Sequence, residues 1–383
     1  MWHSIVDDVT IIDASAYDEA VDNYVGRVRE FPGIVEVVRF GGVSNPGISD
    51  LDLIVIVEDL VDIAPSKLSN LEVRRNSVES VWTHDVSVIP KSLWSDLQYL
   101  AYCSDMQLQL GELAIQEPTL NRNDIFVAMY DGLIDRLICI ARVLCSDICS
   151  VRYALLVMYS LKHTLRLCEQ INIPVEKDQV SLVDEIRELR DTWFEDKKPE
   201  ALHDLAGRCL SAFHKLACAA PKIFSEDMYS EKTAEPETSL QIGIDVRFRF
   251  DSNDVTDVVL SKKRIPFPGR SINLTRISFA LPSEAYWQYV VPCFDAMTKS
   301  ESSQYIDWRV SPKRSFKTVE NALEKAFLRR HSAIAKHTSY LRHRKFNFGT
   351  VHPTASLPVV LRPLGVVAQS KRSLRHLVTK IFL

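Results

Sequence analysis

The sequence predicts an α+β protein, in which a small mixed β-sheet domain with flanking helices precedes a helical bundle and a C-terminal α+β region. Residues 33–57 read as two apolar strands around a Gly- and Pro-containing turn, whereas residues 123–219 show helical apolar periodicity. The 383 residues are 46% hydrophobic and 25% charged, which is typical of a globular chain with room for about two or three domains. The predicted divisions are a sheet domain at 1–118, a bundle at 119–224, a linker at 225–240 and a basic C-terminal α+β region of unknown type at 241–383.

The first domain is organised around a strand, a turn and a second strand. Residues 33–40 form a nearly continuous apolar run, as expected of a buried strand. Gly41 and Gly42 end that strand, and without Cβ atoms they let the chain turn sharply and let a ligand approach the backbone. After the turn VSNPGIS, the second strand begins at Asp50 and Asp52 and continues as LIVIV.

The two aspartates predict a cation site. Alternate strand residues share a face, so Asp50 and Asp52 would project together, about 7 Å apart, and repel each other. Mg²⁺ would remove that repulsion, because it binds carboxylates together with substrate phosphates. Asp85, in the alternating run SVWTHDVSVIP, is expected to add a third carboxylate from the neighbouring strand, as in two-metal phosphoryl transfer. We expect His84 to alternate to the opposite face of that strand.

The segments FGGVSNPGISDLDLIVIV and HDVSVI resemble the nucleotidyltransferase superfamily that includes DNA polymerase β and kanamycin nucleotidyltransferase. The resemblance covers roughly residues 15–115, and its pattern is a glycine turn, a short loop, an Asp-x-Asp strand and an acidic residue on the next strand. It implies three catalytic, metal-binding carboxylates: Asp50, Asp52 and Asp85. It also implies a nucleotide-binding turn made by Gly41, Gly42 and Ser44, the last replacing a serine that many members carry where this chain has Gly42.

The function implied by the resemblance is transfer of a nucleoside monophosphate from an NTP, ATP by default, to an acceptor hydroxyl, with release of pyrophosphate. Two Mg²⁺ ions, or Mn²⁺, would be the cofactors, and Asp85 would act as general base. The pattern does not identify the acceptor. The alternative is a catalytically silent, nucleotidyltransferase-like protein with a binding or regulatory role of the antitoxin type.

Further elements of the first domain follow from apolar spacing. Residues 15–31 predict an amphipathic helix on the back of the sheet, opposite the carboxylates. Its buried side chains should be Tyr17, Ala20, Val21, Tyr24, Val25 and Val28. Residues 64–79 should cross to the third strand as helix or loop, and a short helix should follow Pro90. Residues 106–118 predict a further strand or the exit from the domain.

Four helices are predicted for the second domain, at residues 123–146, 150–171, 178–196 and 199–219. The second of them carries a group of basic and aromatic side chains: Arg152, Tyr153, Lys162, His163 and Arg166. These residues could form a basic wall that contacts a triphosphate or a base. We favour the alternative of a solvated helix face with a core-facing tyrosine.

The C-terminal region is basic. Residues 301–383 hold 16 Lys and Arg against 4 Asp and Glu, whereas the whole chain has a net charge of −4. This asymmetry predicts either a polyanionic partner such as RNA or contact with an acidic neighbouring domain or subunit. Residues 242–261 predict a β-hairpin, and residues 283–298 and 317–335 predict helices.

No run approaches 18 apolar residues and the start lacks a signal-peptide pattern, so we expect a cytoplasmic protein without membrane contact. Cysteine usage agrees with a reducing compartment. Cys139, Cys145 and Cys149 lie in helix-like sequence without metal-ligand spacing, so we expect buried, reduced thiols.

Overall fold

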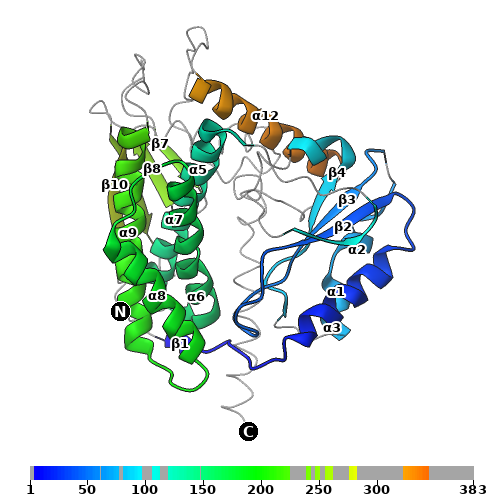
Figure 1. Ribbon diagram of the computed structural model, residues 1–383, viewed down its shortest axis with the longest axis horizontal. Coiled ribbons are helices and arrows are strands. Elements are labelled where there is room, and N and C mark those ends of the chain that lie inside the picture. Colours follow the sequence, from blue (N-terminus) through cyan, green and yellow to red (C-terminus); the bar gives the residue numbers. More distant parts are fainter. Residues whose placement is uncertain are drawn as a thin grey trace, which may run out of the picture.

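The computed structural model is α+β and shows a sheet lobe and a helical bundle side by side, with one long helix lying across both (Figure 1). The structure describes residues 4–60, 62–76, 81–96, 106–112, 120–146, 148–224, 239–242, 246–250, 255–261, 276–282 and 322–344. Within these ranges no helix combines the length and the apolar character needed to cross a bilayer.

The sheet lobe contains a four-stranded mixed sheet in the order β4-β3-β2-β5. Its strands are β2 Ile34–Phe40, β3 Asp52–Val57, β4 Ser87–Pro90 and β5 Gln107–Leu110. Strands β2 and β3 are antiparallel with Phe40 opposite Asp52, β3 and β4 are parallel, and β5 is antiparallel to β2. The strand–turn–strand prediction is therefore confirmed, and the Asp-x-Asp strand does have a neighbour in the predicted run at residues 80–90, although β4 covers only its last four residues.

Helix α1, Ser15–Val28, covers one face of this sheet. Its buried side chains are the six that the apolar spacing predicts. They pack with Leu53 and Val55, and the short helices α2 (Pro65–Leu68) and α3 (Leu71–Asn76) lie in the same core. Because neighbouring strand residues face opposite ways, Asp52 lies on the other face, and the predicted place of α1 behind the carboxylates is confirmed.

The bundle follows as α5 Arg122–Cys145, α6 Val151–Tyr159, α7 Leu161–Gln170, α8 Lys177–Thr192 and α9 Pro199–Phe224. Asn121 caps α5 by accepting hydrogen bonds from two backbone N–H groups, and the Ser150 hydroxyl caps α6 by accepting one from the Tyr153 N–H. The single helix predicted for residues 150–171 is wrong in one respect, because the chain forms two helices that meet at Ser160.

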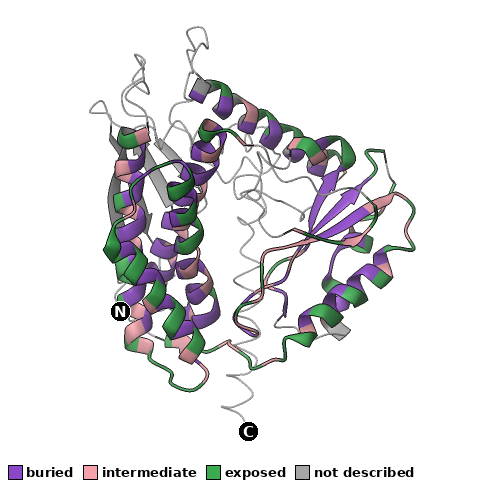
Figure 2. Ribbon diagram, viewed as in Figure 1, coloured by how far each residue is buried: buried purple, intermediate pink, exposed green. Residues whose placement is uncertain are grey.

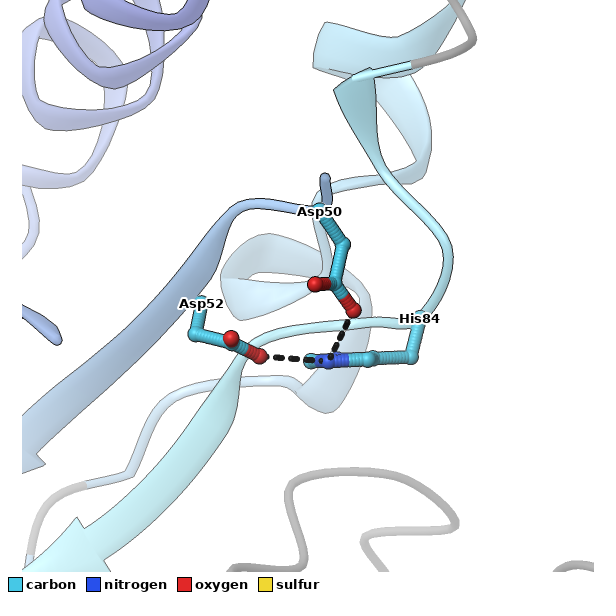
Figure 3. A group of neighbouring side chains, drawn as sticks. All are labelled: Asp50, Asp52 and His84. Atoms are coloured by element: carbon cyan, nitrogen blue, oxygen red, sulfur yellow. Dashed lines mark hydrogen bonds and ion pairs between the residues drawn. The ribbon is translucent and has the colours of Figure 1, made fainter. Parts of the chain in front are cut away.

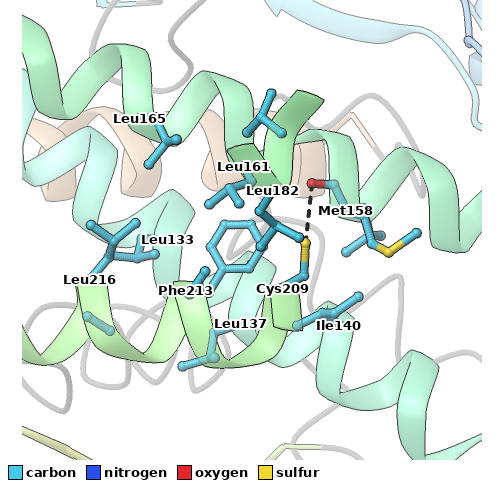
Figure 4. Close-up of a cluster of buried hydrophobic side chains, with 14 of the residues drawn as sticks. Leu133, Leu137, Ile140, Met158, Leu161, Leu165, Leu182, Cys209, Phe213 and Leu216 are labelled. Atoms are coloured by element: carbon cyan, nitrogen blue, oxygen red, sulfur yellow. Dashed lines mark hydrogen bonds between the residues drawn. The ribbon is translucent and has the colours of Figure 1, made fainter. Parts of the chain in front are cut away.

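Apolar side chains from all these helices form one large core, coloured purple along the inner faces in Figure 2. Figure 4 shows its centre, where Leu133 and Leu137 of α5 lie close to Phe213 and Cys209 of α9. The Cys209 thiol donates to the Met158 carbonyl, 3.9 Å away. All six cysteines that the structure describes are free, which agrees with the prediction of reduced thiols. Burial raises the pKa of Cys209 to about 12.

The C-terminal region contributes an antiparallel sheet in the order β10-β9-β8-β7. Its strands are β7 Ser239–Ile242, β8 Val246–Phe250, β9 Val255–Ser261 and β10 Arg276–Pro282. Pairing of β8 with β9 confirms the predicted hairpin. The predicted helix at 283–298 and most of the predicted linker lie outside the described residues.

Helix α12, Ala322–His343, ties the two lobes together. Arg329 and Arg330 pair with Asp124 and Asp131 of α5, each at 2.6 Å. Further along the helix, the contacts are with the sheet lobe. Lys336 Nζ lies 2.9 Å from Asp96 Oδ2, and His337 Nε2 lies 2.8 Å from the Val88 carbonyl oxygen. Just beyond the helix, Arg344 Nη2 donates to the Asp59 carbonyl oxygen at 2.7 Å. These described residues of the basic region thus contact the acidic part of the chain, which is one of the two alternatives that the charge asymmetry predicts.

The beginning of the chain makes a link that the sequence did not indicate. Strand β1, Ser4–Val6, pairs in parallel with β6, Ile148–Ser150, at the side of the bundle. Asp8 then accepts hydrogen bonds from the Ser150 hydroxyl and the Arg152 backbone N–H. The chain crosses from there to α1, so the N-terminal segment also connects the two lobes.

Candidate metal centre

The two aspartates meet a histidine where β3 and β4 begin. Asp52 is the first residue of β3 and Asp50 lies two residues before it, while His84 lies in the turn before β4. Because β3 and β4 are parallel neighbours, both strands begin at the same edge of the sheet. Figure 3 shows the three side chains pointing toward one another across this edge.

The distances define a compact ligand set. His84 Nε2 lies 2.7 Å from Asp52 Oδ1 and 3.7 Å from Asp50 Oδ2. One potential ligand atom from each residue lies within 4.8 Å of the other two. Both aspartate side chains are about 25% exposed and that of His84 about 47%, so solvent reaches the group. The Thr83 hydroxyl donates to Asp50 Oδ2 at 2.8 Å and orients that carboxylate.

Electrostatics bind the group together. Burial lowers the pKa of His84, but the hydrogen bond and negative charge of Asp52, together with Asp50, outweigh burial and raise that pKa to about 9. Burial and the neighbouring charge of Asp50 raise the pKa of Asp52, while His84 lowers it. Arg136 of α5 also stabilises the charged form of Asp52 from the bundle side.

The donor set suits a divalent cation. Two carboxylates and an imidazole nitrogen at these separations can share one ion and leave further coordination positions to water or substrate. A protonated His84 between the carboxylates supplies the positive charge that a cation would supply. Carboxylate oxygens suit Mg²⁺ and Mn²⁺, and a ring nitrogen shifts the preference toward Mn²⁺ and later transition metals.

Asp85 does not join this group, contrary to the sequence prediction. Its carboxylate accepts hydrogen bonds from the Ser69 hydroxyl at 2.6 Å, the Asn70 backbone N–H at 2.7 Å and the Val86 backbone N–H at 2.9 Å. The prediction assumed that strand alternation already applies at residue 85, but β4 begins only at Ser87. Asp85 therefore caps the connection between α2 and α3.

The expectation for His84 was wrong for the same reason. In the turn before β4 the backbone does not alternate, so His84 reaches Asp52 while its Nδ1 lies 2.7 Å from the Asp85 carbonyl oxygen. The sequence signal was present as a histidine beside the expected third acid. Only the strand boundary decides which of the two side chains faces the aspartates.

The glycine turn lies beside the aspartates. Gly41 has a φ of +74°, which favours glycine, and a Cβ at this position would lie 4.0 Å from Asp52 Oδ2. A Cβ on Gly42 would meet nothing within 4 Å. Ser44 donates to the Asn45 side-chain oxygen at 3.2 Å. The phosphate-binding roles of Gly41, Gly42 and Ser44 stay predictions.

The basic residues predicted on one helix face are divided between two helices. Arg152 of α6 is buried, whereas Tyr153 is 45% exposed and does not face the core as expected. Lys162 of α7 is exposed and lies 5.5 Å from the centre of the Tyr159 ring. Arg190 of α8 stacks on the same ring at 4.0 Å. The sequence reasoning missed Arg190 and Arg136, because a single arginine in an amphipathic helix carries no positional signal.

No protein-family model, no curated protein and no solved structure matches this chain.

Proposed function

We propose that this protein is a metal-dependent nucleotidyltransferase whose site is built on Asp50 and Asp52, with His84 in the place expected of Asp85. The observation that carries the proposal is the convergence of two carboxylates and an imidazole within 4.8 Å at the start of β3. The chemistry would be transfer of a nucleoside monophosphate from an NTP to an acceptor hydroxyl, with release of pyrophosphate.

The surroundings of the carboxylates support this proposal. A glycine with positive φ ends the strand that pairs with β3, and it leaves the backbone beside Asp52 open to a phosphate group. Helix α1 covers the opposite face of the sheet, so the carboxylate face is turned away from that core. Arg136 adds positive charge from the bundle side, opposite to the charge of a triphosphate.

When bound, a divalent cation would neutralise phosphate charge and lower the pKa of the attacking hydroxyl. The chain's own groups prepare the site for it. Thr83 orients Asp50 through its hydroxyl, and Asp52 is oriented by His84. His84 Nε2 can hold a proton between the carboxylates or, once it has lost that proton, add a nitrogen ligand. This donor set favours one ion, with Mn²⁺ at least as effective as Mg²⁺.

Asp52→Asn tests the proposal, with Asp85→Asn as the matched control. Pyrophosphate release from each of the four NTPs would be measured with Mn²⁺, with Mg²⁺ and with a chelator, using several candidate acceptors. We expect wild-type release that requires the cation, at least about a thousandfold loss in Asp52→Asn, and near wild-type release in Asp85→Asn. Equal loss in both variants would show that Asp85 belongs to the site and would contradict our assignment.

A second candidate is the silent, nucleotidyltransferase-like binding protein. It is favoured by the bond between His84 and Asp52, because the protein itself can neutralise the carboxylates without an ion. Isothermal titration with Mn²⁺ and NTP separates the two functions. Binding of NTP without pyrophosphate release under any acceptor condition would favour this second candidate.

A further inference from the structure

The turn that carries Asp50 is built into both lobes of the protein. Ile48 is fully buried in the core of the bundle, whereas Leu51, three residues later, is buried in the core of the sheet lobe. Asp50 lies between these two anchors. Its position in the candidate site is therefore determined by the bundle as well as by strand β3.

Hydrogen bonds from the bundle fix the backbone just before Asp50. Arg152 Nε donates to the Ile48 carbonyl at 3.0 Å, and its Nη2 donates to the Ser49 carbonyl at 2.6 Å. Arg190 Nη2 lies 3.4 Å from the Ser49 hydroxyl oxygen. Both guanidinium groups are buried, so these bonds are shielded from water and neither arginine is free to swing to another partner.

The sheet lobe holds the same residues from the other side. The Tyr17 hydroxyl donates to the Ser49 carbonyl at 2.7 Å and accepts from the Gly47 backbone N–H at 3.0 Å. Gly47 has a φ of +89°, and a Cβ there would lie 1.8 Å from the Thr10 carbonyl oxygen. A residue with a side chain at Gly47 would therefore clash with the backbone of the N-terminal segment and adopt an unfavourable φ.

We propose that Arg152 is a positioning residue, which fixes the carbonyl groups of Ile48 and Ser49 and thereby makes the placement of Asp50 depend on docking of the bundle. The guanidinium suits this role because its fork can donate two bonds to consecutive carbonyl groups, which a lysine ammonium cannot do with the same geometry. Arg152 interacts with Asp50 through charge at longer range, and its hydrogen bonds go to the backbone before Asp50, not to the ligand atoms of the candidate site. Its effect on that site rests on the proposed function, whereas its effect on the turn does not.

Hydrogen exchange of the turn, residues 41–51, tests the proposal in Arg152→Met and Arg152→Lys. Arg122→Met is the matched control, because Arg122 Nε also donates to a backbone carbonyl, that of Ile171 at 3.0 Å, but within the bundle. We expect about tenfold faster exchange of the turn in Arg152→Met, an intermediate rate in Arg152→Lys and an unchanged rate in Arg122→Met. Exchange across β2 and α9 should stay at the wild-type rate in all three variants.

Two exchange results would overturn the proposal: an unchanged turn in Arg152→Met, or an increase spread equally over the whole chain. Mn²⁺ affinity, measured on the same proteins, reports the consequence for Asp50. We expect it to fall about tenfold in Arg152→Met and to stay constant in Arg122→Met. If wild type binds no Mn²⁺, the proposed function fails, and the exchange rates alone still decide the role of Arg152.

Discussion

Two sets of aspartates in this molecule meet positive charge in different ways. Asp124 and Asp131 of α5 are almost completely buried and pair with two arginines of α12, which remain charged at any ordinary pH. Asp50 and Asp52 are partly exposed and share a single histidine, whose charge depends on a proton. The first set holds α12 against the bundle, whereas the second stays accessible to solvent.

The two sets of aspartates show what separates a structural acid from a candidate catalytic one. Both sets are close, charged contacts, so short distances alone do not distinguish them. The difference lies in whether the partner is permanent and whether solvent reaches the carboxylates. Glu36 is a third kind of acid. It is fully buried, and its carboxylate has no hydrogen-bond partner in the part of the chain that the structure describes.

The largest effect on stability should come from the buried pair. Arg330→Met removes the buried guanidinium that pairs with the buried carboxylate of Asp131, which should lower the free energy of unfolding by about 3–5 kcal/mol. Urea denaturation of the full chain measures this loss. Adding Asp131→Leu should recover most of the stability, because the uncompensated charge is then removed. A double variant as unstable as the single one would show that the pair is not the cause.

Glu36→Gln should change how stability depends on pH. Burial raises the pKa of Glu36 to about 7 from an ordinary value near 4.5, so the folded state holds the proton more tightly than the unfolded state does. The wild type should therefore lose about 2–3 kcal/mol from this group as the pH rises from 4.5 to 7, with no further loss above that. The variant should lack this part of the pH dependence. Urea denaturation gives the difference in unfolding free energy between wild type and variant at pH 5 and at pH 8. The same difference at both pH values would contradict burial of an unpaired carboxylate.

Asp85→Asn should reduce stability by a smaller amount. The carboxylate accepts three hydrogen bonds that hold the α2–α3 connection, and an amide can replace only part of them, so we expect a loss of about 1–2 kcal/mol. Thermal unfolding measures the loss without added cation. If Asp85 were instead a cation ligand, added Mn²⁺ would stabilise the wild type and not this variant.

The smallest effect is expected at the site itself. His84→Gln removes the positive group that contacts Asp50 and Asp52 and leaves only the more distant charge of Arg136, which should cost roughly 1 kcal/mol because the pair is partly exposed. Mn²⁺ should restore the melting temperature of this variant, since the ion takes over the charge of the histidine. It should not restore Arg330→Met, because the partner of Arg330 is the buried Asp131, which does not belong to this ligand set. Equal responses of the two variants to Mn²⁺ would remove the distinction drawn between the two acidic sets.

Local sequence patterns predicted a large part of this structure. The spacing of Tyr17, Tyr24 and Val28 identified both the helix α1 and the side that it buries. The apolar runs around Gly41 identified β2 and β3, and the alternation of Leu51 with its neighbours assigned the aspartates to the face away from α1. These predictions hold because they depend on periodicity within one element, which the backbone geometry of helices and strands imposes.

The candidate site was predicted in part. Asp50 and Asp52 could be found because they begin a strand that is otherwise apolar. The exchange of Asp85 for His84 could not be found, because it depends on β4 beginning only at Ser87, two residues after Asp85. Alternation assigns a side chain to a face only where the backbone is already hydrogen-bonded as a strand.

The order of apolar and polar residues was enough to specify most of the elements, their buried faces and the pair of carboxylates at the start of β3. The tertiary structure brings His84 to that pair and Arg152 to the turn before Asp50. It also pairs the arginines of α12 with aspartates of α5. Each of these contacts joins residues that are distant in the chain or lie outside regular elements. Their geometry is set by how the two lobes pack, and no local periodicity carries that information.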